Sequence, residues 1–388
     1  MTHEATRMKL TDGGAVLYMA LELSERNWKV LFATRSSARR REVNVAARDL
    51  DRLRTEIAKA KTLYGLPDDA VVTSCYEAGR DGFWLCRALT AHGIDNLVVD
   101  SSSIEVPRRA RRAKTDRIDV FKLMGLLLRW AAGEAGVWSV VRVPDAAVED
   151  VRQLSRSISR VKSELGRHTT RIKALLAKEG LKLARVGGRD WAKCVAGLRL
   201  WNGAPLGVWL QRDLVLEGER LALAAEQLKQ LKAERDALVA QAREPVAVKA
   251  QALARLGGIA AESSFVFATE LFGWRTFANR RELAGVVGLC GTPYRSGDSG
   301  HEQGIAKSGN SRMRTMLVEI SWGWLRYQPR SALARWWQER FGKATRRQRL
   351  IGIVALARKL LVALWRYLEH GLVPDGATLK PLQRARAS

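Results

Sequence analysis

The sequence predicts an α/β domain followed by a largely helical remainder. Three observations support this division. Strand-like runs alternate with helical patterns up to about residue 143, two long segments then carry apolar residues at helical spacing, and the last third holds further helices. At 388 residues the chain is long enough for two or three compact units. We expect an α/β domain over residues 1–143, a linker over 144–247 and a C-terminal domain over 248–388.

In the first domain, three strand-like runs form a meander, after which helices and strands alternate. The expected strands are Ala15–Leu23, Trp28–Thr34, Arg41–Val45, Ala70–Glu77 and Asn96–Asp100. The expected helices are Ala47–Lys61, Phe83–His92 and a segment that begins near Asp116. The order β-β-β-α-β-α-β-α is typical of a mixed α/β sheet.

The linker is predicted to contain two long helices. In Ala146–Gly180 the apolar residues recur at intervals of three, four or seven, and in Leu214–Val239 several leucines lie seven apart. We expect two antiparallel coiled-coil arms, joined by an irregular stretch from Leu181 to Pro205, that form an oligomer contact or brace a nucleic acid. An ordinary helical hairpin packed on a core explains the same periodicity equally well.

The last third begins with a glycine-containing stretch, Leu253–Phe277, that resembles a helix-hairpin-helix element. A loop poor in regular pattern is expected from Gly288 to Arg314. Further helices are expected over Arg312–Tyr327, Ala332–Arg340 and Thr345–Glu369.

The composition favours a nucleic-acid partner. The chain has 66 Lys and Arg residues against 40 Asp and Glu, a net charge of +26, which favours binding to a polyanion. The four cysteines show no C-x-x-C pair, and no apolar run is long and free enough of charge to span a membrane. We expect a reduced, cytoplasmic protein that does not bind membranes.

Four carboxylates lie at predicted strand and helix ends, where an α/β fold would bring them together. They are Glu22, Glu77, Asp116 and Asp119. Carboxylate oxygens suit Mg²⁺ or Mn²⁺, and two such ions can clamp the attacking and leaving oxygens of a phosphodiester. Taken singly, each carboxylate is more simply a helix cap or a solvated strand end. The basic run before Asp116 would bring a phosphate to them, and it comprises Arg108, Arg109, Arg111, Arg112 and Lys114.

The glycine-rich loop offers a candidate nucleophile, Ser296. Serine next to glycine is common in turns without any catalytic role. This loop, however, also carries basic residues that could hold a phosphate for attack. These basic residues are Arg295, Lys307, Arg312 and Arg314. Ser299, Ser308 and Tyr294 remain rival nucleophiles on spacing alone.

Four blocks of sequence together resemble a known family. They read ALELSERNWKVLF, CYEAGRDGFWLCRAL, RRARRAKTDRIDVFKL and GLCGTPYRSG followed by GIAKSGNSRMRTML. Their order and content resemble the insertion-sequence 110 family of DEDD transposases, particularly its 1111 subgroup, over most of the chain. The resemblance implies an N-terminal RuvC-like domain of the ribonuclease H fold, a coiled-coil linker and a mostly helical C-terminal transposase domain with a serine nucleophile.

The resemblance also assigns roles. It places the acidic tetrad on Glu22, Glu77, Asp116 and Asp119, with Mg²⁺ or Mn²⁺ as cofactor, and the nucleophile on Ser296, eleven residues before Lys307. It implies a homo-oligomer, a dimer or tetramer, that recombines the DNA of element ends and target under the guidance of a structured bridge RNA. It also implies a bacterial protein associated with the nucleoid.

The sequence departs from the family in one respect, because Glu22 stands where the tetrad normally begins with aspartate. Glutamate still ligates Mg²⁺, so the site is retained with altered spacing. The leading hypothesis is a metal-dependent recombinase with a serine nucleophile. The alternatives are a Holliday-junction-type nuclease in which water attacks, and a non-catalytic nucleic-acid-binding protein.

Overall fold

The computed structural model describes residues 15–104, 116–296 and 299–381, and for Asp116, residues 293–296 and residues 299–303 it describes the backbone alone. The chain divides into two compact units, Met1–Pro144 and Asp145–Ser388. The finer division into three domains stays a prediction.

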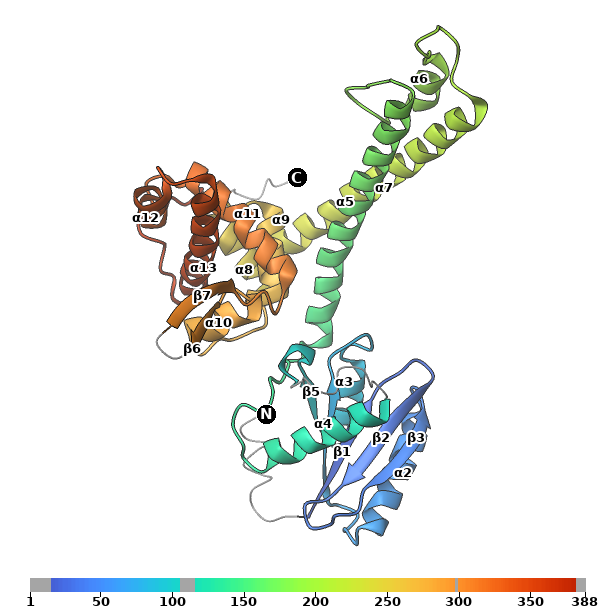
Figure 1. The fold of residues 1–388 in the computed structure, drawn as a ribbon, viewed down its shortest axis with the longest axis vertical. Coiled ribbons are helices and arrows are strands. Elements are labelled where there is room, and N and C mark those ends of the chain that lie inside the picture. Colours follow the sequence, from blue (N-terminus) through green and yellow to red (C-terminus); the bar gives the residue numbers. More distant parts are fainter. Residues whose placement is uncertain (1–14, 105–115, 297–298, 382–388) are drawn as a thin grey trace. The chain divides into compact units, whose positions relative to one another are not determined.

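The first unit is built on a five-stranded mixed sheet (Figure 1). Its strands are β1 (Val16–Glu22), β2 (Asn27–Ala33), β3 (Arg41–Ala46), β4 (Val71–Glu77) and β5 (Asp95–Val99). The strand order is β3-β2-β1-β4-β5, with β1 antiparallel to β2 and parallel to β4. The predicted mixed α/β class is confirmed, whereas the RuvC-like assignment stays a prediction.

Helices cover both faces of this sheet. They are α2 (Leu50–Leu63), α3 (Trp84–Ala91), the short 3-10 helix η1 (Ser101–Ser103) and α4 (Asp116–Ala131). The residues Leu17, Met19 and Leu21 of β1 pack in one core with α2 and α3. Tyr18 and Ala20 pack in a second core with α4, which crosses the other face (Figure 1). Because β1 is buried on both sides, it reads as a continuous apolar run.

The second unit begins with two long helices, α5 (Ala146–Lys178) and α7 (Val208–Gln241), with the short α6 (Trp191–Gly197) near their far end (Figure 1). The end of α5 meets the start of α7, and Val151 and Leu154 near the start of α5 pack with Leu238 and Val239 near the end of α7. The two helices are therefore antiparallel, as predicted; their coiled-coil character stays a prediction.

The rest of the second unit packs around one large apolar core. Its elements are α8 (Pro245–Ala254), α9 (Ala261–Phe267), the π-helix η2 (Ala268–Phe272), α10 (Arg280–Val287), β6 (Gly291–Ser296), β7 (Ser299–Ile305), α11 (Ser311–Tyr327), α12 (Ala332–Phe341) and α13 (Arg346–His370). Among the described residues, no helix is both long and apolar enough to cross a membrane.

The stretch that resembles a helix-hairpin-helix element contains a glycine turn between α8 and α9. The amide of Gly257 in this turn donates a hydrogen bond to the carbonyl oxygen of Thr378 at 3.2 Å. That amide is therefore satisfied within the protein. The predicted phosphate contact of this element gains no support from Gly257.

Candidate active site

Glu22 and Glu77 end two neighbouring parallel strands of the first unit. In the β1–β4 ladder Leu21 lies opposite Tyr76, so the next residues, Glu22 and Glu77, are neighbours at the carboxyl ends of the strands. Glu22 is half-buried and Glu77 is exposed. The register therefore brings together two carboxylates that lie 55 positions apart in sequence (77 − 22).

Strand alternation places both glutamates on the face of the sheet that α4 covers. Ala20, two residues before Glu22, and Cys75, two residues before Glu77, belong to the core under α4. Side chains two residues apart on a strand point to the same face. Both carboxylates therefore lie on the α4 side.

The first turn of α4 supplies the two predicted aspartates. Val120 and Leu123 are buried against the sheet, and the carbonyl oxygen of Leu123 lies 3.9 Å from Cys75 Sγ. Asp119 precedes Leu123 by four positions, so it lies on the sheet-facing side of the helix. Asp119 is half-buried, and the side chain of Asp116 lies outside the described residues.

Two cations tie this end of α4 to the sheet through Glu42 on β3. Arg117 Nε lies 3.1 Å from Glu42 Oε2, and Lys29 Nζ lies 2.9 Å from Glu42 Oε1. Lys29 is also the cross-strand neighbour of Glu22. The first turn of α4 is therefore held on the same face as the strand-end glutamates. Lys29, Glu42 and Arg117 are not evident as partners from the sequence, because only the β2–β3 pairing and the packing of α4 bring them together.

The donor set suits a hard divalent cation by residue type, because it consists of carboxylates on one face of the sheet. Among the described residues, however, no group of three or more His, Cys, Asp or Glu side chains lies close enough to hold a metal ion. Asp116, one of the four predicted ligands, is outside that set. The metal site therefore stays a prediction supported by register and residue type.

Ser296 lies in a β-hairpin of the second unit and not in an irregular loop. It is the last residue of β6 and lies opposite Ser299, the first residue of β7. The hairpin lacks an alternating apolar pattern, which is why the sequence showed no strand signal there. The side chains of Ser296, Ser299, Tyr294 and Arg295 lie outside the described residues, so the choice of nucleophile stays a prediction.

Two of the predicted phosphate-binding arginines are engaged by the protein itself. Arg312 Nη1 donates to Glu270 Oε1 at 3.2 Å, and Arg312 Nη2 donates to Ser159 Oγ at 2.6 Å. Arg314 Nη1 donates to the carbonyl oxygens of Val287 and Ser308 at 3.0 and 3.1 Å. These contacts give both arginines a structural role.

Lys307 differs from these two arginines because it is exposed, with a left-handed backbone (φ 58°) just after β7. It stays a candidate phosphate ligand. The basic run from Arg108 to Lys114, comprising Arg108, Arg109, Arg111, Arg112 and Lys114, lies outside the described residues.

Glu270 is the centre of this buried network. It is 3% exposed and also accepts hydrogen bonds from Arg152 at 3.0 Å and Arg156 at 3.2 Å, both on α5. Burial alone would raise the pKa of Glu270, but the charges and hydrogen bonds of Arg152 and Arg156 hold that pKa below its usual value. Glu270 is not among the residues predicted from the sequence, although a single carboxylate inside the apolar run FVFATELFGW is a signal for a buried, paired charge.

Comparison with known proteins identifies the class of this protein as transposase. Residues 250–335 match the family model described as "Transposase IS116/IS110/IS902 family". The protein y4rJ of Sinorhizobium fredii, named as a candidate transposase, is 39% identical over 383 residues, which cover 95% of this chain and 96% of the relative. The transposase for insertion sequence element IS1533 of Leptospira borgpetersenii is 32% identical over 110 residues, 28% of this chain and 30% of the relative. The chain belongs to the IS116/IS110/IS902 family of transposases.

Proposed function

We propose that this transposase cuts and rejoins DNA strands by means of a divalent metal site in the first unit and a serine nucleophile, Ser296, in the second. The observation that carries the metal site is the placement of Glu22 and Glu77 at adjacent strand ends. Both lie on the face of the sheet on which the first turn of α4 is held. Family membership supplies DNA transposition as the overall reaction.

Four carboxylates would hold the metal, namely Glu22, Glu77, Asp116 and Asp119. A bound Mg²⁺ or Mn²⁺ supplies Lewis-acid stabilisation of the charge that develops on phosphate oxygens. Glu22 and Glu77 stand at adjacent strand ends, and the first turns of α4 pack on the sheet through Val120 and Leu123, with the exposed Arg117 paired to Glu42 beside them. Ligands on regular elements keep a site's geometry better than ligands on loops.

In the proposed strand exchange the oxygen of Ser296 attacks a DNA phosphorus. A bond forms between Ser296 Oγ and phosphorus, and the bond from phosphorus to the leaving strand's oxygen breaks. The proton lost by the serine hydroxyl ends on that leaving oxygen. A hydroxyl of a second strand then attacks the phosphoserine, releases Ser296 and joins the new strand.

We further propose that the family's 1111 subgroup resemblance extends to guidance by a structured bridge RNA and to a dimeric or tetrameric protein. The net charge of +26 supports binding to more than one polyanion at once. Sequencing the RNA that co-purifies with the protein tests this proposal. A preparation that catalyses strand exchange after complete ribonuclease treatment would contradict RNA guidance.

The serine assignment is tested by trapping the covalent protein–DNA adduct. We expect Ser296→Ala to abolish the adduct and Ser299→Ala, three positions along the same hairpin, to retain it. The reverse pattern would transfer the role to Ser299. Free DNA ends without any adduct in the wild-type protein would favour the alternative, a nuclease in which water attacks.

The acidic site is tested by Asp116→Asn, with Asp69→Asn as a control at an exposed residue outside the site. We expect Asp116→Asn to lose strand exchange in Mg²⁺ while its melting temperature stays near that of the control. Wild-type exchange by Asp116→Asn would rule this residue out as a metal ligand.

A further inference from the structure

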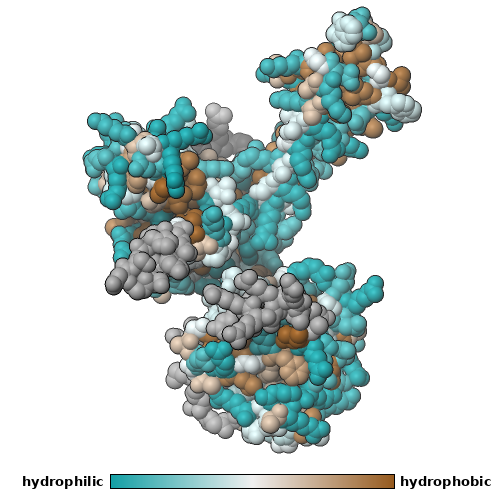
Figure 2. Space-filling model, in the orientation of Figure 1, coloured by the Kyte–Doolittle hydropathy of each residue, from teal (hydrophilic) through white to brown (hydrophobic). Residues whose placement is uncertain are grey.

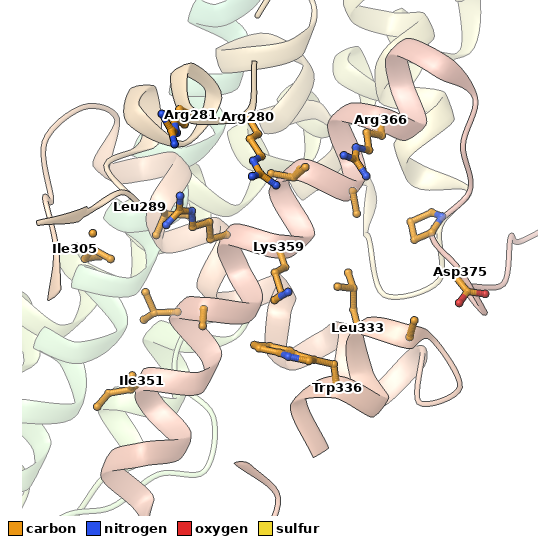
Figure 3. Close-up of a pocket in the computed structure, with 18 of the residues that line it drawn as sticks. Arg280, Arg281, Leu289, Ile305, Leu333, Trp336, Ile351, Lys359, Arg366 and Asp375 are labelled. Carbon is orange, nitrogen blue, oxygen red and sulfur yellow. The ribbon is translucent and has the colours of Figure 1, made fainter. Parts of the chain in front are cut away.

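The second unit contains an open groove of about 1270 Å³ between α10, α12, α13 and the β6–β7 hairpin (Figure 3). Its basic side chains are Arg280, Arg281, Lys307, Arg358, Lys359 and Arg366. Asp375 is the single carboxylate that lines it among the described residues. The groove therefore carries a strong excess of positive charge.

The cations of this groove are exposed and lack acidic partners. All six side chains are exposed, and within the described part of the chain none of them forms an ion pair with a carboxylate. Figure 3 shows Arg280 on α10 and Lys359 and Arg366 on α13 reaching into the same hollow. This contrasts with Arg312, whose charge is neutralised by Glu270 at 3.2 Å. A cationic cluster without acidic partners is suited to an anionic ligand.

The remaining lining of the groove is apolar. It includes Leu333, Val354, Val362, Leu372 and Val373, with Ile351 at one end. On the second unit, Figure 2 shows hydrophobic surface bordered by hydrophilic side chains. Duplex DNA presents mainly phosphates and sugars to such a surface, whereas an unpaired strand also presents the faces of its bases.

Helix α13 contributes one side to the buried core and the opposite side to the groove. Leu356, Leu360 and Leu364 lie on the side of α13 that is buried in the core. Groove-lining residues recur on its other side at intervals of three or four, from Ile351 to Arg366. The groove side of α13 therefore carries both apolar and basic residues, which alternate along the helix.

We propose that this groove binds an unpaired DNA strand, with phosphates on the basic residues and bases against the apolar lining. The proposal rests on the proposed function for its choice of DNA, because Gly291 and Ile305 of the hairpin that carries Ser296 also line the groove. A second copy of this chain is a poorer occupant, since each copy carries a net charge of +26. The groove holds a strand that has been opened for exchange.

The test measures binding of a fluorescent 12-nucleotide unpaired DNA to the full chain without divalent metal, by anisotropy. The groove variant carries Arg358→Gln with Arg366→Gln. The matched control carries Arg346→Gln with Arg347→Gln, which removes the same charge from exposed positions of the same helix outside the groove. Equal thermal unfolding of both variants verifies folding.

We expect the groove variant to lose two phosphate contacts, which lowers the magnitude of the slope of log affinity against log salt by about 1.4. This corresponds to roughly 25-fold weaker binding of the unpaired strand at 0.1 M salt. The control is expected to change affinity less than about threefold. Ile351→Asn removes an exposed apolar contact and is expected to weaken unpaired-strand binding about fivefold with the salt slope unchanged.

Equal losses in the groove variant and the control would show diffuse electrostatics and overturn the proposal. The proposal would also be overturned if the groove variant lost as much affinity for duplex DNA as for the unpaired strand. The same holds if it lost as much or more affinity for RNA of the same sequence. The measurement needs no catalysis, so an adduct that survives Ser296→Ala would contradict the proposed function without affecting this result.

Discussion

Glu217 is predicted to hold together the far end of the α5–α7 hairpin. It is fully buried on α7, with its Oε2 atom 2.7 Å from His168 Nδ1. Its Oε1 atom accepts hydrogen bonds from Arg171 at 3.0 Å and from Arg220 at 2.5 Å. Since His168 and Arg171 lie on α5, one carboxylate joins the two helices. The perturbation is Glu217→Gln, which keeps the shape and removes the charge.

The pKa of Glu217 and the general cost of breaking a buried ion pair give similar magnitudes for this change. Burial raises the pKa of Glu217, but the hydrogen bonds from His168, Arg220 and Arg171 outweigh it and lower the pKa from 4.5 to about 2. That difference corresponds to roughly 3 kcal/mol of stability at neutral pH. Breaking a buried ion pair by removing one partner costs about 3–5 kcal/mol. We therefore expect Glu217→Gln to destabilise the hairpin by about 3 kcal/mol.

Hydrogen exchange of α5 and α7 peptides measures this locally in the full chain. We expect about 100-fold faster exchange in Glu217→Gln near the tip of the hairpin. Glu226→Gln is the matched control, because Glu226 lies on the same helix but is exposed and 3.9 Å from Lys229 Nζ. It is expected to change stability by less than about 1 kcal/mol.

The stability of the α5–α7 hairpin is also expected to depend on pH through the ionisation of Glu217. A carboxylate whose pKa is lowered by folding stabilises the folded state fully above its unfolded value and loses this effect as the pH falls through its folded value. Wild-type hairpin protection should therefore decline between pH 4.5 and about 2, and this part of the decline should be absent in Glu217→Gln. If hydrogen exchange of Glu217→Gln at pH 7 were as slow as in the wild-type protein, Glu217 would not stabilise the hairpin.

Glu270→Gln should cost about 3–5 kcal/mol in urea unfolding, because it leaves the buried Arg152 and the half-buried Arg312 without a counter-charge. Glu262→Gln, which breaks a more exposed 2.8 Å pair with Lys162, should cost less than about 1 kcal/mol. Gly288→Ala should lower the melting temperature strongly, since its φ is +68° and the added Cβ would clash with the carbonyl oxygen of Ser308. Gly285→Ala, on the open side of α10, should be neutral or stabilising by up to about 1 kcal/mol. In the proposed metal site, Glu22→Gln should weaken Mn²⁺ binding in calorimetry at least about tenfold and Glu22→Asp should retain it. Unchanged Mn²⁺ binding in Glu22→Gln would remove this residue from the proposed site.

The order of elements in the first unit could be read from sequence because β1, β2 and β4 contain largely apolar, buried runs bounded by polar turns, although β3 is mostly polar. Asp49 caps α2 by accepting a hydrogen bond from the amide of Arg52 at 2.8 Å, so this helix begins a few residues later than its apolar spacing alone suggested. The pairing of β1 with β4 could not be read in this way. It aligns Glu22 with Glu77 through a crossover, and nothing local in either strand specifies that register.

In the second unit, the β6–β7 hairpin and the buried ion pairs of Glu270 could not be predicted from the sequence. The strands β6 and β7 consist largely of glycine, polar and charged residues, so propensity indicated a loop where ladder hydrogen bonds form a hairpin. Arg312 looked like a phosphate ligand because it is a basic residue after a glycine-rich stretch. Its buried partner, Glu270, lies 42 positions earlier (312 − 270), and only the packing of η2 against α11 and α5 brings them together.

Net charge alone therefore does not identify a nucleic-acid surface in this protein. Arg152, Arg156 and Arg312 belong to the basic excess, yet all three converge on one buried carboxylate and hold α5 to the rest of the unit. Arg358 and Arg366 add the same charge but have no acidic partner among the described residues, and both line an open groove. Because an ion pair must be broken and resolvated before its cation can bind phosphate, the unpaired arginines offer the larger net gain on binding DNA. The pairing of each cation, and not its position in a basic stretch of sequence, decides which residues are available to the substrate.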